Sequence, residues 1–409
     1  MTIANDVNIG EPFRIGMLIN DQRYRSYTIQ IVALLLLMLA FAFLISNAIS
    51  NLAALGKDFS FSFLFDPASY DINQRLIEYN SQSPHWHAAL VGILNTLLVA
   101  VLGCIMATFI GVTAGVLRLS DNWLISKIML VYIEAIRNVP VLIWILILAA
   151  VVNEFLPPPS MFRETVDIAD RATPYLGGFL VMTNRGFYIP SPIWEAGSNI
   201  VVWTFALSFV AAWLFGKWAA MRQASTGMTL PTFWIKLAII LLPAIIVYYA
   251  MGSPISLDFP VLKRFNFEGG YTISDSLIAL WLALSIYTGA FIAENVRAGI
   301  QAISHGQSEA AHALGLPAGR TMNLVILPQA LRIIIPPLIS QYLNLTKNSS
   351  LAIAVGYMDA TGTLGGISLN QTGREMECIV LLMAFYLIVS LLISGAMNVY
   401  NNSVKLVER

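Results

Sequence analysis

Charged residues are scarce in this chain of 409 residues: only 11% are Asp, Glu, Lys or Arg, whereas 57% are hydrophobic. Soluble globular proteins carry about 25% charged residues, so this composition excludes an ordinary soluble domain and indicates a polytopic membrane protein. Positive and negative charges balance to a formal net charge of zero. The chain therefore lacks the basic character of nucleic-acid-binding proteins, which argues against a nucleic-acid partner.

Residues that carry catalysis or bind metals are also few. The two cysteines, Cys104 and Cys378, cannot form a disulfide framework, and both lie in apolar segments, so we interpret them as inert packing residues. His85 and His87 offer two possible ligands without a nearby cysteine or third histidine, and we predict no metal site. The sequence contains no nucleophile elbow and no carboxylate-rich metal motif, which disfavours a membrane enzyme. We assign no catalytic residue.

Apolar segments of about 20 residues, the length that a bilayer core requires, recur along the chain. They predict an all-α polytopic membrane protein with about eight transmembrane helices, near 28–50, 89–117, 126–152, 200–216, 236–251, 274–297, 331–356 and 376–398. The first apolar run follows a polar tail and is long enough to span, so we expect no cleavable signal peptide.

The placement of Lys and Arg predicts the orientation of the spans. With the N-terminus inside, thirteen of these residues fall on the cytoplasmic side and eight on the opposite side. Eight spans then place both termini in the cytoplasm, together with the stretch around 304–316. The long polar excursion 153–199 falls outside.

The stretch from Ser304 to Pro337 is a comparatively polar island between two apolar segments. Ser304-x-x-Gln307 is typical of a capping box, and Gly315 followed by Pro317 predicts the end of a short helix. Its small alanines would let another surface approach the backbone closely. These residues alone leave two interpretations open, a capped connector between membrane helices or a docking element.

A family resemblance separates the two interpretations. Glu309-Ala310-Ala311, Gly315 and Leu327-Pro328 follow the E-A-A-x3-G-x9-I-x-L-P pattern of the EAA loop of ATP-binding-cassette (ABC) importer permeases, with Val325 at the isoleucine position. The runs ENVRAGIQAISHGQSEAAHALGL, LPQALRIIIPPL, LTKNSSLA and RNVPVLIWIL resemble the polar amino-acid uptake branch of that family. The similar segments cover about 88–152 and 274–400.

The resemblance implies the type I ABC importer permease fold, with the EAA segment as a coupling helix that sits on a separate cytosolic ATPase. It carries this coupling role over to Gly306, Glu309, Ala310, Ala311, Gly315, Leu327 and Pro328. The chain lacks the G-x-x-x-x-G-K-[ST] run that cradles nucleotide phosphates, so we expect it to bind no cofactor, with ATP and Mg held by the partner subunit.

The implied partners are an ABC ATPase dimer, a second homologous permease, a periplasmic amino-acid-binding protein and membrane lipid. The implied location is the bacterial inner membrane, and the implied function is import of polar or broad-range L-amino acids into the cytoplasm. The main alternative is a self-contained secondary transporter. That class predicts inverted repeats with paired broken helices, which we do not find in corresponding halves of the sequence. A membrane scaffold is a third possibility.

The branch usually has about five spans, so this chain is enlarged. It resembles the first permease of the broad-specificity L-amino-acid and glutamate/glutamine/aspartate/asparagine systems, and this favours pairing with a different permease. The predicted organisation is a cytoplasmic tail over 1–27, three helices over 28–152, an inserted region with two extra helices over 153–252, and a C-terminal core over 253–409 with the coupling loop at 298–330. The insertion serves either as a rim for the binding protein or as a packing surface for the partner permease.

Polar residues inside the spans are candidates for the translocation path, because ionisable groups are costly there. Glu134, Arg137 and Asn138 lie in the third span, which Pro140 is expected to kink. Glu134 and Arg137 share a helix face, so they either pair as a buried structural element or line the path.

The seventh span carries a second polar patch, formed by Asn344, Lys347, Asn348 and Ser349. Lys347 either faces an amino-acid carboxylate or pairs with a carboxylate of the partner permease.

Three further features complete the predictions. Glu294 and Arg297 are expected to anchor the boundary of the EAA loop. Gly111-x3-Gly115 predicts close packing of the second span against another helix. Thr361–Gly366 is glycine-rich and, in the predicted topology, forms an outer lid or docking surface for a binding protein.

Overall fold

A computed structural model of the chain describes residues 22–54, 56 and 59–404. The predicted tail 1–27 lies mostly outside this range. The described residues contain eight helical segments that are long and apolar enough to cross a membrane, which confirms the predicted number. They run over Tyr24–Asn51, His85–Arg118, Val141–Phe162, Ser198–Thr226, Thr232–Ala250, Asp275–Gln301, Ala318–Val355 and Glu375–Tyr400.

The centre of the bundle is helix α8 (Asp275–Gln301). It packs against α3 (His85–Arg118), α4 (Trp123–Arg137), α5 (Val141–Phe155) and α11 (Leu327–Asn348). The predicted glycine pair of α3 makes the closest contact. A Cβ atom at Gly111 would lie 2.5 Å from the side chain of Ile292, and one at Gly115 would lie 2.6 Å from the carbonyl oxygen of Ala293. The helices approach this closely because both positions lack a side chain, as the spacing predicted.

The third predicted span is wrong as a single kinked helix, because two helices replace it. Helix α4 covers Trp123–Arg137 and helix α5 covers Val141–Phe155, with Pro140 in a non-helical conformation (φ −55°, ψ 138°) between them. A proline has no N–H to donate and disfavours helical geometry at the residue before it, so the chain breaks here rather than bends. The Nε1 of Trp144 donates to the carbonyl of Ile136 at 3.3 Å and bridges the break.

After α8 the chain forms α9 (His305–Ala313) and α10 (Ala318–Thr321), then a π-helical turn (η4, Met322–Ile326) that leads into α11 (Leu327–Asn348). Helix α11 continues through both of its internal prolines. It is followed by the 3-10 segment η5 (Ser349–Val355), the π-helical segment η6 (Thr361–Ser368), α12 (Leu369–Thr372) and α13 (Glu375–Val404).

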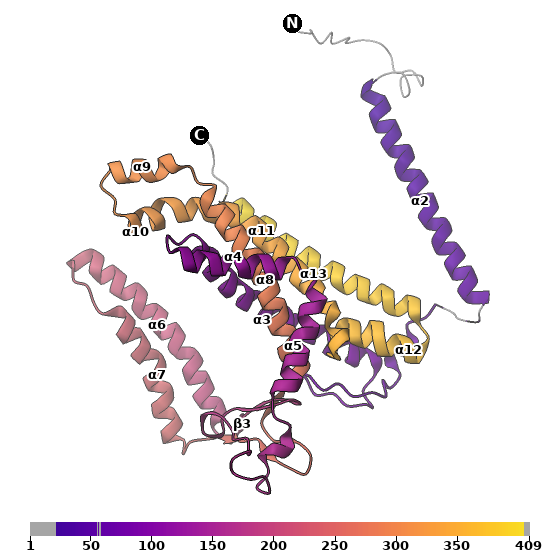
Figure 1. Cartoon of the computed structure of the whole chain (residues 1–409), viewed down its shortest axis with the longest axis horizontal. Helices are drawn as coiled ribbons and strands as arrows, with labels where there is room; N and C mark the ends of the chain where they lie inside the picture. The colour runs from indigo at the N-terminus through magenta and orange to yellow at the C-terminus, as the bar shows by residue number, and fades with distance from the viewer. Residues whose placement is uncertain (1–21, 55, 57–58, 405–409) are drawn as a thin grey trace.

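A small β subdomain lies at one end of the bundle, where the sequence predicted only a polar excursion (Figure 1). It contains a three-stranded antiparallel sheet and two strand pairs, formed by β1 (Val181–Thr183), β2 (Gly186–Ile189), β3 (Ser191–Trp194), β4 (Ile255–Asp258), β5 (Val261–Leu262), β6 (Phe267–Glu268) and β7 (Tyr271–Ile273). Strand β2 pairs with β7 and β3 pairs with β4, so residues from both sides of the predicted boundary at 252 share these sheets.

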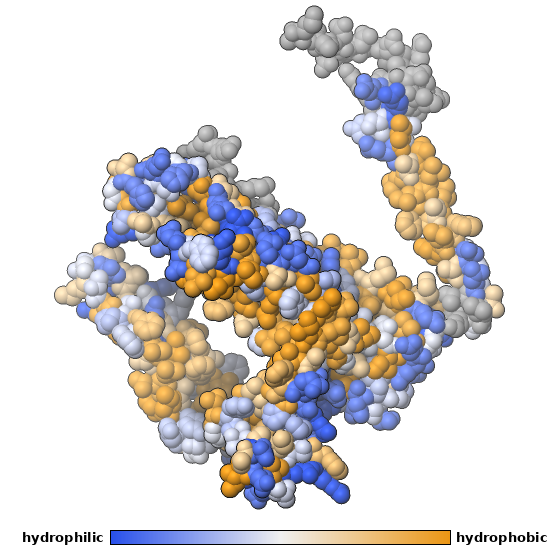
Figure 2. Space-filling model, in the orientation of Figure 1, coloured by the Kyte–Doolittle hydropathy of each residue, from blue (hydrophilic) through white to orange (hydrophobic). Residues whose placement is uncertain are grey.

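Two elements stand apart from the bundle in Figure 1. One is α2 (Gln22–Ala54), and the other is the hairpin of α6 (Ser198–Thr226) and α7 (Thr232–Ala250), whose main contact is with each other. Figure 2 shows that both present hydrophobic surface along most of their length. Such surfaces are stable in a lipid environment and costly in water, which fits their identification as membrane spans.

Candidate functional site

The short helix α9 projects from the end of the bundle opposite the β-strands (Figure 1). It begins after Ser304 as predicted, but the predicted capping box is wrong, because the side chain of Ser304 makes no cap hydrogen bond. The Gln307 side chain instead accepts a hydrogen bond from Gln329 Nε2 of α11 at 3.4 Å. This bond connects α9 to the start of α11.

Gly315 ends α9 in a left-handed conformation with φ of +79°. Its N–H donates to His312 O at 2.9 Å, and the N–H of Leu316 donates to Ala311 O at 3.1 Å, which satisfies the last carbonyls of the helix. No atom lies within 4 Å of a Cβ built at this position. The requirement for glycine is therefore conformational, as predicted, and does not arise from crowding.

The two neighbouring alanines of the EAA pattern face different ways. Ala311 is 4% exposed and packs inward, whereas Ala310 is exposed. Glu309 is 74% exposed and bonds to Nδ1 of His305 at 3.2 Å, and Leu314 is 83% exposed. The accessible surface of α9 thus includes Glu309, Ala310 and Leu314. Leu314 was not among the predicted residues, although an apolar residue directly before a helix-ending glycine was a signal for it.

The remaining predicted coupling residues lie on either side of this surface. Gly306 is in the first turn of α9 and has open space around it. Leu327 and Pro328 begin α11 directly after the π-helical turn η4, and the changed hydrogen-bond register there accommodates a residue without an N–H. These residues position the chain as it returns to the bundle.

Glu294 of α8 holds two cations at the base of this loop. Arg297, one turn later, donates from Nε to both carboxylate oxygens at 3.2 and 3.1 Å. Arg118, the last residue of α3, also forms an ion pair with Glu294. The pairing of Glu294 with Arg297 agrees with the predicted anchor. Arg118 was not predicted as a partner of Glu294, although both lie at the same predicted membrane boundary.

Glu134 and Arg137 do not pair, so the predicted structural ion pair is wrong. Glu134 is exposed, and Asn138 Nδ2 donates to its backbone carbonyl at 2.7 Å and to its Oε2 at 3.5 Å. Arg137 is half-buried, with its guanidinium 5.1 Å from the centre of the Phe291 ring of α8. The Arg137 guanidinium lies over the Phe291 ring instead of beside Glu134, because a cation is attracted to the face of an aromatic ring.

The second polar patch divides in a similar way. Asn344 and Lys347 of α11 are exposed, Asn348 is half-buried, and Ser349 is buried with its hydroxyl donating to Thr346 O at 2.8 Å. Within the described chain no carboxylate lies at ion-pair distance from Lys347. No hydrogen bond or ion pair between described residues joins this patch to Glu134, Arg137 or Asn138.

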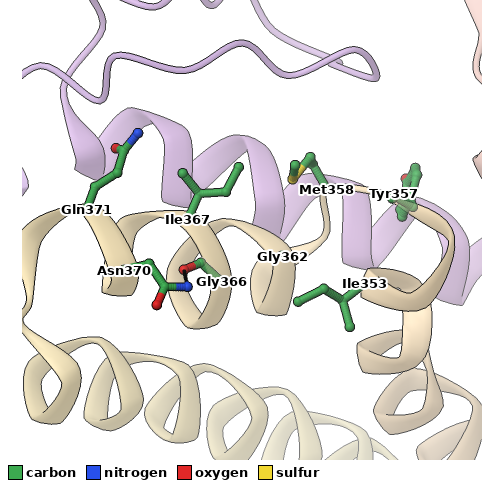
Figure 3. Close-up of a pocket in the computed structure, with 9 residues that line it drawn as sticks. Ile353, Tyr357, Met358, Gly362, Gly366, Ile367, Asn370 and Gln371 are labelled. Carbon is green, nitrogen blue, oxygen red and sulfur yellow. Dashed lines mark hydrogen bonds between the residues drawn. The ribbon is translucent and has the colours of Figure 1, made fainter.

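Thr361–Gly366 is not an exposed lid, because much of the segment is buried against α3. Gly362, Thr363 and Leu364 are buried, and a Cβ at Gly92 of α3 would overlap Thr363. Beside it lies a pocket of about 440 Å³ that Ile353, Tyr357, Met358 and Ile367 line, with Asn370 and Gln371 as its polar side chains (Figure 3). Its lining carries no Asp, Glu, Lys, Arg or His, so it offers no partner for a charged ligand.

Asp359, which the sequence analysis did not single out, is a buried acid before this segment. Its Oδ1 accepts the N–H of Gly362 at 2.8 Å and its Oδ2 accepts the hydroxyl of Tyr386 at 3.4 Å. These bonds connect the segment to α13. The residue could have been found from the rule that an acid between two apolar segments is rarely without a partner.

The loop before α3 is fixed by a second buried network. Ser368 bonds to His85 Nδ1 at 2.9 Å and to the hydroxyl of Tyr70 at 3.1 Å. Burial raises the pKa of the Tyr70 phenol, so this hydroxyl stays protonated near neutral pH. His85 is therefore engaged in a structural contact, and His87 stacks on Trp86. In the described ranges, no three His, Cys, Asp or Glu side chains come together as metal ligands would.

Comparison with known proteins gives consistent matches. Residues 205–404 match the family described as binding-protein-dependent transport system inner membrane component. The chain is 51% identical over 417 residues to the glutamate/glutamine/aspartate/asparagine transport system permease protein BztB of Rhodobacter capsulatus, covering 97% of both chains. It is 43% identical over 400 residues to the general L-amino acid transport system permease protein AapQ of Rhizobium johnstonii, covering 98% of this chain and 96% of that one. A solved amino acid ABC transporter with histidines is 19% identical, with a TM-score of 0.45, covering 78% of this chain and 95% of that one.

Proposed function

This chain belongs to the binding-protein-dependent permease family of amino-acid ABC transport systems, and on that premise we propose that α9 is the element on which the ATPase of the system docks. As a permease of this family the chain is the membrane component of an importer, and ATP is hydrolysed by a separate subunit. The family works with an ATPase and a substrate-binding protein. ATP and Mg then belong to the ATPase, and this chain needs no cofactor of its own. Family membership also argues against a self-contained secondary transporter.

The exposed face of α9 is the observation that supports docking. A nine-residue helix is marginal alone, since isolated helices shorter than about 12 residues rarely form in water. Here it is held by the Gly315 turn, the buried Ala311 and the Gln307–Gln329 bond, while Glu309, Ala310 and Leu314 remain open. A fixed backbone with small and apolar exposed side chains suits a rigid contact that transmits motion.

Cysteine crosslinking in the assembled transporter tests this docking. Ala310→Cys should crosslink to a cysteine placed in the ATPase surface, whereas Ala311→Cys should not, because that side chain faces inward. The native thiols give little background, since Cys378 is buried and Cys104 half-buried. Equal crosslinking at both positions, or none at Ala310→Cys in an active complex, would contradict the assignment. ATP-dependent uptake without an ion gradient would exclude the secondary-transporter mechanism.

We propose that the amino acid crosses the membrane along a path between this chain and a second, different permease. The exposed polar residues of two helices support this, namely Glu134 of α4, Asn138 directly after it, and Asn344 and Lys347 of α11. Exposed to lipid, such groups would be costly, and a water-filled path or a partner helix removes that cost. Arg137, Asn348 and Ser349, predicted beside them, are partly or fully buried and support the path from behind.

The proposed cargo is polar or broad-range L-amino acids, in line with the names of the two similar permeases. The positive-charge bias supports an orientation with both termini and α9 in the cytoplasm and the β subdomain outside. In this arrangement the inserted unit comprises 153–252 together with the strands over 255–273 that pair with it.

A further inference from the structure

The β subdomain contains a cavity whose lining has a surplus of positive charge. Its volume is about 690 Å³. Arg163 and Arg171, which precede β1, line it together with Lys263 and Arg264 of the loop between β5 and β6. Glu164 is the acid in this lining. Four cations and one carboxylate therefore surround a single space.

The contacts of these cations leave Arg171 without a counter-charge. Lys263 Nζ pairs with Glu268 Oε2 at 2.6 Å. Arg163 Nη2 donates to the carbonyl of Arg264 at 2.5 Å, which connects the two segments that line the cavity. Arg171 is half-buried, and among the described residues its guanidinium has no carboxylate at ion-pair distance and no hydrogen-bond partner. A partly buried cation without a partner is costly, so an anion from outside the chain would stabilise it.

A second, mainly apolar cavity adjoins the first. It has a volume of about 450 Å³ and shares Phe162, Arg171 and Leu262 with the first cavity. Arg171 is the charged residue of its lining. Ile168 also lines it, and this side chain is 93% exposed. Arg171 therefore lies at the border between a cationic cavity and an apolar one.

A strained loop leaves the rim of the second cavity. Pro174 lines that cavity, and the loop that follows is closed by backbone bonds between Tyr175 and Leu180, at 2.7 and 3.3 Å. Leu176 in this loop has φ of +51° and is 78% exposed. A bulky residue in a left-handed conformation is strained, and such strain gathers at functional sites. The loop holds an apolar side chain outward, where the core of the chain gains nothing from it.

We propose that the two cavities and Leu176 form a docking surface for the substrate-binding protein of the transporter, and that Arg171 pairs with a carboxylate of that protein. The proposal rests on the proposed function, because it needs the β subdomain outside and α9 in the cytoplasm. Figure 1 shows the β subdomain at the opposite end of the bundle from α9. Apart from Phe162, the residues that line the cavities lie outside the eight candidate spans, so a permease packed along the spans would not cover them.

The chemistry of the surface favours a protein over a small molecule. Arginine and large apolar side chains side by side are typical of the residues that carry the binding energy of protein interfaces. Figure 2 shows hydrophobic and hydrophilic patches next to each other on the β subdomain. Ile168 and Leu176 are too exposed to enclose a small ligand, whereas a protein surface would cover both.

Affinity measurements on the assembled transporter in lipid nanodiscs test the proposal, with the purified substrate-binding protein of the same system as the probe. Arg171→Gln should weaken binding about tenfold or more and reduce its dependence on salt, because a charge pair is lost. Ile168→Ser should weaken binding about fivefold through the loss of an apolar contact. Arg75→Gln is the matched control. It removes the same charge from an exposed residue that lines neither cavity and should bind like the wild type.

Three results would overturn the proposal. Wild-type affinity in both Arg171→Gln and Ile168→Ser would show that the surface is not used. Equal weakening in Arg75→Gln would show a diffuse charge effect. Binding of free L-glutamate by the full chain, lost in Arg171→Gln, would assign the cavity to a small anion.

Two further measurements keep the outcome unambiguous. Thermal unfolding checks that each variant is folded, and if Arg171→Gln alone unfolds, Ile168→Ser decides, because an exposed side chain adds little to the fold. The crosslink of Ala310→Cys to the ATPase, made in the same preparation, reports the proposed function separately. Weakened docking with an intact crosslink supports the surface, and wild-type docking in both variants with an intact crosslink overturns the surface alone.

Discussion

Arg118, the last residue of α3, is ion-paired with Glu294 of α8, a residue 176 positions later in the chain. The same carboxylate also holds Arg297, so it joins the ends of two helices just before the chain leaves the bundle to form α9. A movement of α9 would therefore reach α3 through charged groups as well as through packing. We therefore expect both the stability of the bundle and the coupling of α9 to α3 to depend on the Glu294 side chain.

Glu294→Gln should destabilise the bundle and reduce uptake. The substitution leaves two partly buried guanidinium groups without their carboxylate, and hydrogen bonds to charged groups contribute roughly 2 kcal/mol each. We expect a lower thermal unfolding temperature in detergent and weaker ATP-dependent uptake in reconstituted vesicles. Arg118→Gln should have a smaller effect, because the bonds between Glu294 and Arg297 remain.

Glu268→Gln is the matched control for that substitution. Glu268 is paired with Lys263 in the β subdomain, but both side chains are more than half exposed. Exposed pairs contribute about 0–1 kcal/mol, so this variant should unfold and transport like the wild type. If Glu268→Gln lowered the unfolding temperature and the uptake as much as Glu294→Gln, the prediction of a special role for Glu294 would be wrong.

Gly315→Val should reduce uptake while the chain still inserts in the membrane. A branched residue at φ of +79° is strained by about 1–2 kcal/mol, so the end of α9 and the path into α11 would be displaced. Gly319→Val is the control, since Gly319 also has open space around it but lies in a helical turn. Uptake of radiolabelled amino acid and the amount of membrane-inserted chain distinguish the two. Normal uptake by Gly315→Val would count against the coupling role.

Composition and length alone predicted the eight spans, because a bilayer requires long apolar helices and the chain supplies them. The Gly315 turn and the close contact at Gly111 were also predicted, since each rests on a local property of glycine. What local patterns could not predict were competitions with distant residues. The Gln307 side chain, which was predicted to cap α9, bonds to Gln329 instead. The Arg137 guanidinium lies on the Phe291 ring instead of beside Glu134.

The β subdomain was missed for a related reason. Its strands are two to four residues long, too short for an alternating pattern to stand out from a polar loop. The pairing of β2 with β7 joins segments separated by the whole α6–α7 hairpin. Of the candidate site, the family pattern predicted the position of α9, but the opposite orientations of Ala310 and Ala311 required the packed structure.

Lys347→Met should weaken the apparent affinity for the transported amino acid without reducing the amount of assembled complex. The ammonium is exposed at the level of a membrane span, and loss of a charge-assisted bond costs roughly tenfold or more in affinity. Uptake measured over a range of substrate concentrations gives the KM. Lys347→Arg keeps the positive charge, so its KM should stay close to that of the wild type. Loss of the partner permease from the purified complex, with unchanged KM in what remains, would instead assign Lys347 to assembly.

Gly111→Leu should prevent normal packing of α3 on α8. A side chain there would run into Ile292, and overpacking a close contact costs about 1–3 kcal/mol. Gly395→Leu is the matched control, because Gly395 is also inside a membrane helix but has nothing within 4 Å of a Cβ. The yield of monodisperse protein after detergent extraction should fall for the first variant alone. Equal yields would show that the two helices do not depend on this contact.

Removal of the α6–α7 hairpin should leave the bundle folded, because the two helices pack mainly on each other. The strands on either side of the hairpin, β3 and β4, pair with each other. Trp194 of β3 is opposite Ile255 of β4, and the N–H of Glu195 donates to Pro254 O at 3.0 Å. An Asn-Gly turn in place of 196–253, together with Pro254→Thr to supply the turn N–H that proline lacks, can therefore join the strands. Its thermal unfolding should match that of the full chain. A deletion over 191–258, which removes both strands, should unfold at lower temperature, and equal destabilisation by the shorter deletion would show that the hairpin is part of the core.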